Sequence, residues 1–208
     1  MYTPKFNQIN DRAILLEAMR AYSFAILCGP ATTDAGAAST VATHLPLVVD
    51  DEGDYGVLEG HFAKANRHWQ SLASRETLVV FSGPHSYVSP SLYTEELSVP
   101  TWNYIAIHAY GTMQLIEEES AKDSLLKKLI AIHDPAYADR WRALPEGYRR
   151  TMLGSIVGFR IPIARIEGKF KISQNRAPAE RASVRAAHAQ GSPDQQALAA
   201  WMSRLIAE

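Results

Sequence analysis

Short segments of β-type composition follow one another along this chain, with few helices between them. Segments such as FAILCG, TVATHLPLVVD and TLVVFSG are apolar or β-branched and are bounded by residues typical of turns. Apolar and polar residues alternate over a longer stretch in WNYIAIHAYGTMQLI. The last segment of this kind is IVGFRIPIARIEGKFKISQN. Strands that follow one another in this way pair mostly as hairpins. The pattern therefore predicts a mainly β fold with flanking helices, in which about six antiparallel strands close into a small barrel.

Helical periodicity is found outside these segments. Asn10 or Asp11 can cap a helix that runs to Tyr22, and residues 117–134 have an amphipathic pattern with acidic residues in the first turn. Residues 84–100 contain three prolines and little periodicity, which favours a long ordered loop.

The composition changes after Asn175, where Ala, Arg, Glu and Gln predominate. We predict one barrel domain over residues 1–176 and a helical tail over residues 177–208, with helices in 178–190 and 193–207 separated by a Gly-Ser-Pro break. An apolar stripe is expected to pack the tail on the barrel or on a partner subunit, through Leu198, Trp201, Met202 and Leu205.

The charge balance limits the classes of partner. With 21 Lys+Arg against 22 Asp+Glu the formal net charge is -1, so DNA binding would need a local basic patch. No apolar run approaches the roughly 20 residues that cross a bilayer, so no membrane insertion is expected. The single cysteine, Cys28, cannot form an internal disulfide, and the chain fits a reducing cytoplasm.

The usual catalytic signatures are missing from the sequence. It contains no GxxxxGK[ST], GxGxxG, GxSxG or HExxH motif, so whether the protein is an enzyme stays open. Four histidines lie in or beside predicted strands: His44, His61, His85 and His108. No two of them have the short spacing that places both side chains on one face, so we predict no metal site.

Two clusters of hydrogen-bond donors are more informative. GHFAKANRHW places Lys64 and Asn66 at a strand-to-helix junction, where backbone N–H groups and the helix dipole favour an anion such as phosphate. KFKISQNR ends a strand with residues that could hold a phosphate, a hydroxylated chain or a ring with carbonyl groups. Taken alone, each cluster could equally be a solvated strand end.

Seven strings, taken in order, resemble the PaiB-like FMN-binding negative transcriptional regulator family: MYTPKFN, ATHLPL, GHFAKAN, GPHSYVSPSLY, VPTWNYIAIHAYG, SIVGFRI and KISQNR. The resemblance runs from Met1 to about Arg176. It implies a six-stranded antiparallel Greek-key split barrel of the FMN-binding type, related to pyridoxamine-phosphate-oxidase-like proteins. It also implies a homodimer with FMN at the subunit interface.

The resemblance also implies roles for individual residues. It assigns Lys64 and Asn66 to the FMN phosphate, although many relatives have Arg where this chain has Lys64, which lacks the bidentate fork. Four residues would reach the phosphate, the ribityl chain or the ring edge: Lys171, Ser173, Gln174 and Asn175. Five more would lie near the flavin ring: His44, His61, Trp102, Asn103 and Tyr104.

Three functions follow from this resemblance. The first is a flavoprotein that uses FMN in redox chemistry with reduced nicotinamide, as an oxidoreductase or flavin reductase. The second is a negative transcriptional regulator that binds DNA directly, for which the basic cluster Arg176, Arg181 and Arg185 gives thin support because Glu180 interrupts it. The third is a flavin-binding module without turnover.

Overall fold

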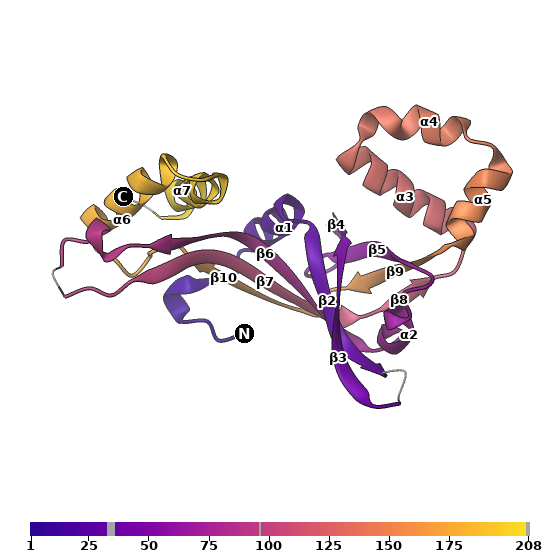
Figure 1. The fold of residues 1–208 in the computed structure, drawn as a ribbon, viewed down its shortest axis with the longest axis horizontal. Coiled ribbons are helices and arrows are strands. Elements are labelled where there is room, and N and C mark those ends of the chain that lie inside the picture. The colour runs from indigo at the N-terminus through magenta and orange to yellow at the C-terminus, as the bar shows by residue number, and fades with distance from the viewer. Residues whose placement is uncertain (33–35, 96, 207–208) are drawn as a thin grey trace. The chain divides into compact units, whose positions relative to one another are not determined.

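The computed structural model describes residues 1–32, 36–95 and 97–206, and these residues form two β-sheets with helices around them (Figure 1). The six-stranded sheet has the order β1-β10-β7-β6-β2-β3. Its strands are β1 (Gln8–Ile9), β2 (Phe24–Thr32), β3 (Ala38–Pro46), β6 (Glu76–Val88), β7 (Thr101–Thr112) and β10 (Arg165–Lys171). The four-stranded sheet has the order β4-β5-β9-β8, with β4 (Val48–Asp50), β5 (Val57–Ala63), β8 (Gln114–Ile116) and β9 (Ile156–Pro162).

Seven α-helices lie within the described ranges: α1 (Arg12–Ala21), α2 (His68–Leu72), α3 (Glu119–His133), α4 (Ala138–Ala143), α5 (Glu146–Gly154), α6 (Pro178–Ala189) and α7 (Pro193–Leu205). Three 3₁₀ turns accompany them: η1 (Lys5–Asn7), η2 (Pro90–Leu92) and η3 (Pro135–Tyr137). None of the helices in the part of the chain that the structure describes is both long and apolar enough to cross a membrane.

The chain divides into two compact units. The first consists of Met1–Leu15, Ser82–Ile107 and Glu167–Glu208, and the second of Leu16–Phe81 and His108–Ile166. Strands β6 and β7 contribute residues to both units.

In the first unit, helix α7 contacts β10 through an aromatic pair. The Trp201 ring meets the buried Phe170 ring of β10 edge-on, with 5.3 Å between ring centroids. Leu198, about one turn before Trp201, and Met202, the residue after it, are also buried. Ser192 begins α7 with a capping box, in which its hydroxyl accepts from the backbone N–H of Gln195.

The second unit has its own core, in which Phe62 of β5 and Phe159 of β9 pack with 5.1 Å between ring centroids. Helix α3 is joined to β4 and β5 by Lys128, whose Nζ donates to Asp50 at 2.5 Å and to Glu59 at 2.7 Å. Each salt bridge is partly exposed, so the packing of α3 depends more on apolar contacts such as that of Leu125 with Val48.

The predicted loop over residues 84–100 differs from the structure in its first part. Strand β6 continues to Val88, with Pro84, Ser86 and Val88 buried and the residues between them exposed. The sequence alternates here, but Pro and Ser occupy inward positions where a strand usually has apolar branched residues. The rest of that segment is η2 and irregular structure, apart from Glu96, which is outside the described residues.

The predicted last strand over residues 156–175 is two strands in two different sheets. Strand β9 ends at Pro162 and β10 begins at Arg165. Of the two predicted bend positions, Pro162 is therefore near the break, whereas Gly168 lies inside β10, where it is paired with Ile9. A Cβ on Gly168 would lie 2.9 Å from the Ile9 carbonyl oxygen, so glycine permits a close approach there.

One buried histidine on α6 predicts a pH dependence of stability. His188 is 1% exposed, neither ring nitrogen has a hydrogen-bond partner among the described residues, and burial lowers its pKa from the usual 6.5. Because the folded state binds this proton less readily than the unfolded state, His188 favours folding above the unfolded pKa. This contribution falls as the pH decreases below 6.5.

The free energy of unfolding of the wild type should fall between pH 7.5 and pH 5. We expect His188→Leu to make this fall less steep, by up to about 1.4 kcal/mol per pH unit. Urea unfolding at a series of pH values measures it. The His44→Gln variant, at an exposed histidine on β3, is the control. An H188L slope equal to that of the wild type would show that His188 does not contribute.

Candidate functional site

The residues predicted to hold a cofactor lie in both units. The first unit contains Trp102, Asn103 and Tyr104 of β7, Lys171 of β10, and Ser173, Gln174 and Asn175 just after it. The second unit contains His44 of β3, His61 of β5, and Lys64 and Asn66 before α2. Each group is described by itself below.

In the first unit, the start of β7 meets the end of β10. Lys171 Nζ donates to Thr101 Oγ1 and, at 2.8 Å, to the Trp102 carbonyl oxygen. Asn103 is fully buried and forms a reciprocal pair with Ser173: Asn103 Nδ2 lies 3.0 Å from Ser173 Oγ, which is 3.2 Å from Asn103 Oδ1. Ser173 has a φ of 68°, so the chain turns sharply at this residue.

A small pocket of about 120 Å³ opens at this junction. It is lined by Tyr93, Val99, Pro100, Thr101, Asn103, Lys171, Ser173, Asn175 and Arg176. Ligand sites for drug-sized molecules start at about 300 Å³, so this pocket suits a small polar group and not a tricyclic ring. We call it the Lys171 pocket.

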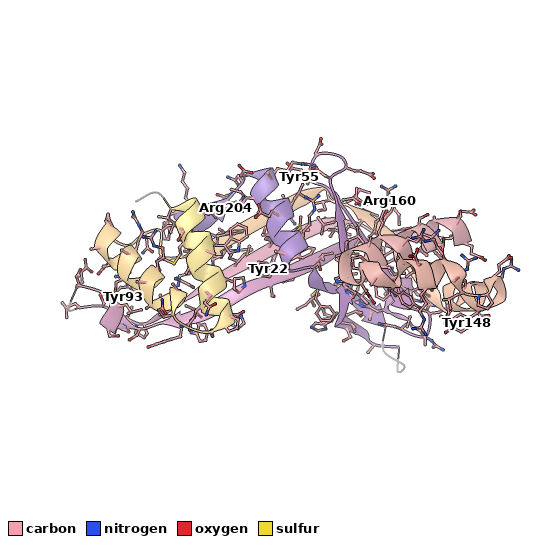
Figure 2. All side chains as sticks on the ribbon, turned by 90° about the horizontal axis from the view of Figure 1, so that it is seen from above. Tyr22, Tyr55, Tyr93, Tyr148, Arg160 and Arg204 are labelled. Carbon is pink, nitrogen blue, oxygen red and sulfur yellow. The ribbon has the colours of Figure 1, made fainter. Side chains whose placement is uncertain are left out.

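The Lys171 pocket is electropositive. Burial lowers the pKa of Lys171, and the positive charges of Lys169 and Arg176 lower it further. The Arg176 guanidinium stacks 3.8 Å from the centre of the Tyr93 ring (Figure 2 labels Tyr93). Cations that disfavour one another in a partly buried pocket would be stabilised by an anion between them.

The Tyr93 hydroxyl provides a second observation about this pocket. Its oxygen is buried and has no hydrogen-bond partner among the described residues. A buried hydroxyl without a partner costs free energy of about 1 to 3 kcal/mol. A ligand with acceptor oxygens in the Lys171 pocket would give such a hydroxyl a partner.

The wall of the pocket is held by Glu180 of α6, which is 2% exposed. Its Oε1 accepts from the backbone N–H of Thr94 at 3.0 Å and of Glu95 at 3.4 Å, and Oε2 lies 3.8 Å from Arg176 Nη1. Burial raises the pKa of Glu180, but these hydrogen bonds and the Arg176 charge outweigh it, so the pKa is lowered. Glu180 therefore connects α6 to the loop that carries Tyr93.

The other predicted residues of this group have different positions. Gln174 closes the turn after β10, since its Oε1 accepts from Ile172 N at 2.8 Å and its Nε2 donates to the Phe170 carbonyl oxygen. Tyr104 is half-buried beside Lys169, whose Nζ is 5.2 Å from the ring centre. Trp102 is 53% exposed, and its ring lies 6.1 Å from that of Tyr87, which leaves a flat aromatic surface open to solvent.

In the second unit, Asn66 is occupied locally. Its Oδ1 accepts from the backbone N–H of His68, and its Nδ2 is 3.4 Å from Thr43 Oγ1, which also contacts His68 Nδ1 at 2.9 Å. Asn66 thus satisfies one of the backbone donors at the start of α2 that an anion would use. Lys64 is exposed, and its carbonyl oxygen accepts from Trp69 Nε1 at 3.3 Å.

The two histidines of this group differ in environment. His44 is exposed and stacks near Phe24 with 6.2 Å between ring centroids. His61 is half-buried, burial lowers its pKa, and its Nδ1 has no partner within the described part of the chain. Within the same part of the chain, no three His, Cys, Asp or Glu side chains form a group that could hold a metal ion.

Sequence reasoning assigned no site role to three residues that shape the Lys171 pocket: Tyr93, Thr101 and Glu180. Tyr93 and Thr101 lie in two of the strings that carry the family resemblance, GPHSYVSPSLY and VPTWNYIAIHAYG, and this was the available signal for them. Arg176 belongs to the donor-rich KFKISQNR segment but was not among the residues assigned to the cofactor.

The residues of the Lys171 pocket fit the phosphate end of FMN. Lysine and arginine form charge-assisted hydrogen bonds to phosphate oxygens, and the Tyr93 and Thr101 hydroxyls add neutral donors. The pocket volume of about 120 Å³ matches a terminal group and excludes the ring. The fit rests on this donor set and on the unpartnered Tyr93 hydroxyl.

Comparison with known proteins gives the family. The model of a family described as "Putative FMN-binding domain" matches residues 1–165. The chain is 35% identical over 182 residues to the Protease synthase and sporulation protein PAI 2 of Bacillus subtilis (strain 168), covering 85% of this chain and 83% of that protein. An uncharacterized protein of Emericella nidulans is 32% identical over 182 residues, covering 69% of this chain and 72% of that protein.

Among solved structures, the flavocytochrome Anf3 from Azotobacter vinelandii has a TM-score of 0.60 at 16% identity, covering 81% of this chain and 72% of that chain. This likeness and the six-stranded sheet confirm the predicted fold class, mainly β with flanking helices. The family model likewise confirms the prediction of FMN as the cofactor. The match over residues 1–165 and the relative in Bacillus subtilis together show that the chain belongs to this family of FMN-binding domains.

Proposed function

We propose that this chain binds FMN with its phosphate in the Lys171 pocket and uses the flavin in redox chemistry with reduced nicotinamide. The observation that carries the proposal is the group of cations around an unpartnered buried hydroxyl, Lys171 and Arg176 beside Tyr93. Bound FMN supplies a ring that accepts a hydride. The residues of this chain bind the phosphate and orient the cofactor.

The remaining predicted residues have narrower roles in this proposal. Ser173 and Asn103 fix the turn that presents Lys171, and Asn175 is exposed at the pocket rim. Trp102 offers a flat surface of the kind on which an aromatic ring stacks. Lys64, Asn66, His44 and His61 lie in the second unit, and this proposal gives them no role in the Lys171 pocket.

The experiment that tests this function compares two flavins that differ in one group. FMN carries a phosphate and riboflavin does not, so fluorescence titration should show FMN bound at least tenfold more tightly, as expected for one or more charge-assisted hydrogen bonds. Reduced nicotinamide should then bleach the flavin absorption. Equal affinity for both flavins would contradict the phosphate site, and an unchanged spectrum would favour a flavin-binding module without turnover.

Direct repression of transcription is the alternative function. Direct DNA binding would require several Lys and Arg side chains on one face of the protein. Because the net charge is -1, few basic residues are left to contact DNA once Lys171 and Arg176 are assigned to the FMN phosphate. Nanomolar, sequence-dependent binding to duplex DNA at physiological salt would favour this alternative.

We also propose a homodimer, supported by apolar side chains exposed in the first unit. Four apolar side chains are exposed on the segment from the end of β6 to the start of β7, which we call the β6–β7 apolar patch: Tyr87, Leu97, Val99 and Trp102. The rings of Tyr87 and Trp102 lie 6.1 Å apart, and Leu97 is 97% exposed. An exposed patch of this kind marks an interface in a water-soluble chain. A second copy is the partner we propose, because closed two-fold dimers are the commonest assemblies.

Light scattering should therefore give twice the chain mass of 23.0 kDa. Leu97→Glu should raise the dimer dissociation constant by about tenfold to a hundredfold, the effect of losing one buried leucine, as measured by sedimentation equilibrium. Ile132→Glu on α3, at an exposed apolar position outside the patch, is the matched control and should have no effect. A monomer at micromolar concentration would contradict the dimer.

A further inference from the structure

Lys171 has a charge environment that disfavours its ammonium form. Among the described residues it forms no ion pair, whereas Lys127 and Lys128 each pair with at least one carboxylate. Burial lowers the pKa of Lys171, and the positive charges of Lys169 and Arg176 lower it further. A larger fraction of Lys171 is therefore the neutral amine than of an exposed lysine at the same pH.

The hydrogen bonds of Lys171 hold this amine in one orientation. Nζ donates to Thr101 Oγ1 and, at 2.8 Å, to the Trp102 carbonyl oxygen. A neutral amine has two hydrogens and one lone pair, so these two acceptors bind both hydrogens and leave the lone pair without a partner. A partly buried lysine beside other cations is also the kind that acts as a nucleophile.

The same pocket carries groups that suit a phosphate. The Arg176 guanidinium stacks on Tyr93, 3.8 Å from the ring centre, and the buried Tyr93 hydroxyl has no partner among the described residues. The volume of about 120 Å³ suits a small anion with few additional atoms. The Lys171 pocket therefore places a nucleophilic amine beside donors for a phosphoryl group.

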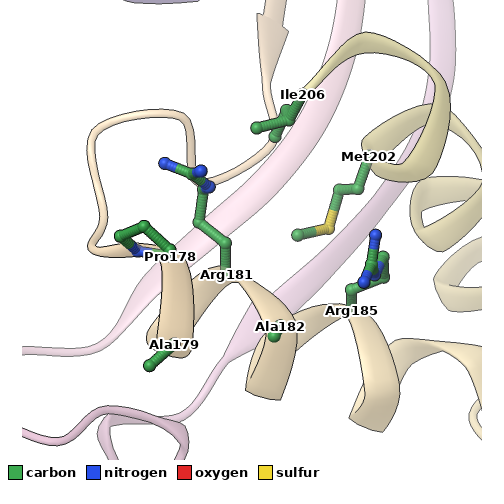
Figure 3. Close-up of a pocket in the computed structure, with 7 residues that line it drawn as sticks. All are labelled: Pro178, Ala179, Arg181, Ala182, Arg185, Met202 and Ile206. Atoms are coloured by element: carbon green, nitrogen blue, oxygen red, sulfur yellow. The ribbon is translucent and has the colours of Figure 1, made fainter. Parts of the chain in front are cut away.

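Two arginines at the start of the tail belong to a different cavity. Arg181 and Arg185 lie between α6 and α7 (Figure 3), and neither lines the Lys171 pocket. Among the described residues that line the Lys171 pocket, Arg176 is the only arginine. A phosphoryl group beside Lys171 would therefore depend on Arg176.

We propose that Lys171 is a modification site that is acylated by small acyl phosphates bound in its pocket. The Nζ lone pair forms a bond to the carbonyl carbon, the bond from this carbon to the phosphoryl oxygen breaks, and phosphate leaves with the electron pair. The proton lost by the nitrogen goes to the leaving phosphate, so the step needs no other reactant. Arg176 and the Tyr93 hydroxyl hold the phosphoryl group. Acetyl phosphate is the probe, because it is little larger than phosphate itself.

Acylation would also regulate the pocket, and this consequence rests on the function proposed above. An acyl group removes the positive charge of Lys171 and occupies part of the pocket. The acetylated chain should therefore bind FMN at least tenfold more weakly and riboflavin with unchanged affinity.

Mass spectrometry of the full chain, incubated with acetyl phosphate and no flavin, measures the acetylation rate of each lysine. Lys171 should react at least tenfold faster than the exposed Lys5, and its rate should saturate with reagent concentration, because the reagent binds first. Arg176→Gln should slow Lys171 at least tenfold and leave Lys5 unchanged. Arg185→Gln, the same charge change on α6, should affect neither lysine by more than about twofold.

Acetic anhydride, which carries no phosphate, separates phosphoryl binding from the reactivity of the amine. With this reagent Arg176→Gln should slow Lys171 by less than about threefold, since only the charge beside the amine changes. An equal slowing with both reagents would overturn the phosphoryl site. Inorganic phosphate at millimolar concentration should slow acetylation of Lys171 by acetyl phosphate and not that of Lys5.

Three other outcomes would overturn the proposal: equal rates at Lys171 and Lys5, a Lys171 rate that rises linearly with acetyl phosphate, or no protection by inorganic phosphate. FMN distinguishes this failure from that of the proposed function. Selective acetylation that FMN does not slow would support the modification and contradict the FMN phosphate site. Uniform acetylation in a chain that prefers FMN to riboflavin at least tenfold would overturn the modification alone.

Discussion

Replacing Lys171 by methionine is expected to lower the affinity for FMN by about tenfold to a hundredfold, and to leave the affinity for riboflavin unchanged. Lys171 supplies a charged donor in a partly buried pocket, and a hydrogen bond to a charged group contributes about 1.5 to 3 kcal/mol. Methionine keeps the length and apolar character of the lysine stem, so the change is mainly the loss of charge. Titration with each flavin, followed by flavin fluorescence, measures both affinities.

Lys5→Met provides the matched control, because Lys5 is exposed in the same unit and does not line the pocket. It removes the same charge and should change FMN affinity by less than about twofold. If Lys171→Met weakened riboflavin as much as FMN, the lysine would support the fold of the site and not the phosphate. If neither affinity changed, the phosphate would lie elsewhere, and Lys64 would be the next candidate.

Replacing Gly111 by alanine is expected to destabilise the protein by about 3 kcal/mol or more, the largest effect on stability that we predict. A Cβ at this position of β7 would lie 2.2 Å from the Pro162 carbonyl oxygen and 2.7 Å from Ile161 Cγ2. The backbone on both sides is held, since Ala164 N donates to the Tyr110 carbonyl oxygen at 2.8 Å. The two segments cannot separate without losing this bond. Urea unfolding at pH 7.5 measures the change.

Gly147→Ala in α5 is the control for the Gly111 variant. Apart from its chain neighbours and the backbone of its own helix, no atom of the described residues lies within 4 Å of a Cβ added there. Alanine is also the better helix former, so this change should stabilise the protein by about 0.5 to 1 kcal/mol. A Gly111→Ala protein as stable as the wild type would mean that β7 and the end of β9 can move apart.

The elements with regular periodicity were predictable from the sequence. Helix α3 lies within the predicted 117–134 segment, and α6 and α7 are separated by the predicted Gly-Ser-Pro break. Asp11 was one of two proposed caps for α1, and its Oδ1 accepts from the backbone N–H of Ile14. In each case a local rule and the tertiary packing favour the same structure.

Features that depend on convergence of distant segments were not predictable in the same way. The division of residues 156–175 between two sheets depends on which strands they meet, and nothing in the local pattern indicates it. Lys171, Ser173 and Asn175 of the KISQNR string line one pocket, and their contact with FMN stays a prediction. Tyr93 could not be added to them, because it comes from a loop about eighty residues earlier whose path is set by tertiary contacts.

The carboxylate of Glu180 has a consequence for protein engineering. It satisfies the backbone of Thr94 and Glu95, although 86 and 85 residues separate the partners along the chain. The conformation of that loop thus depends on the tail helix as well as on the hydrogen bonds within the loop. Chimeras between relatives should therefore exchange the loop and the start of α6 together, because a transplanted loop would meet a tail that lacks its anchor.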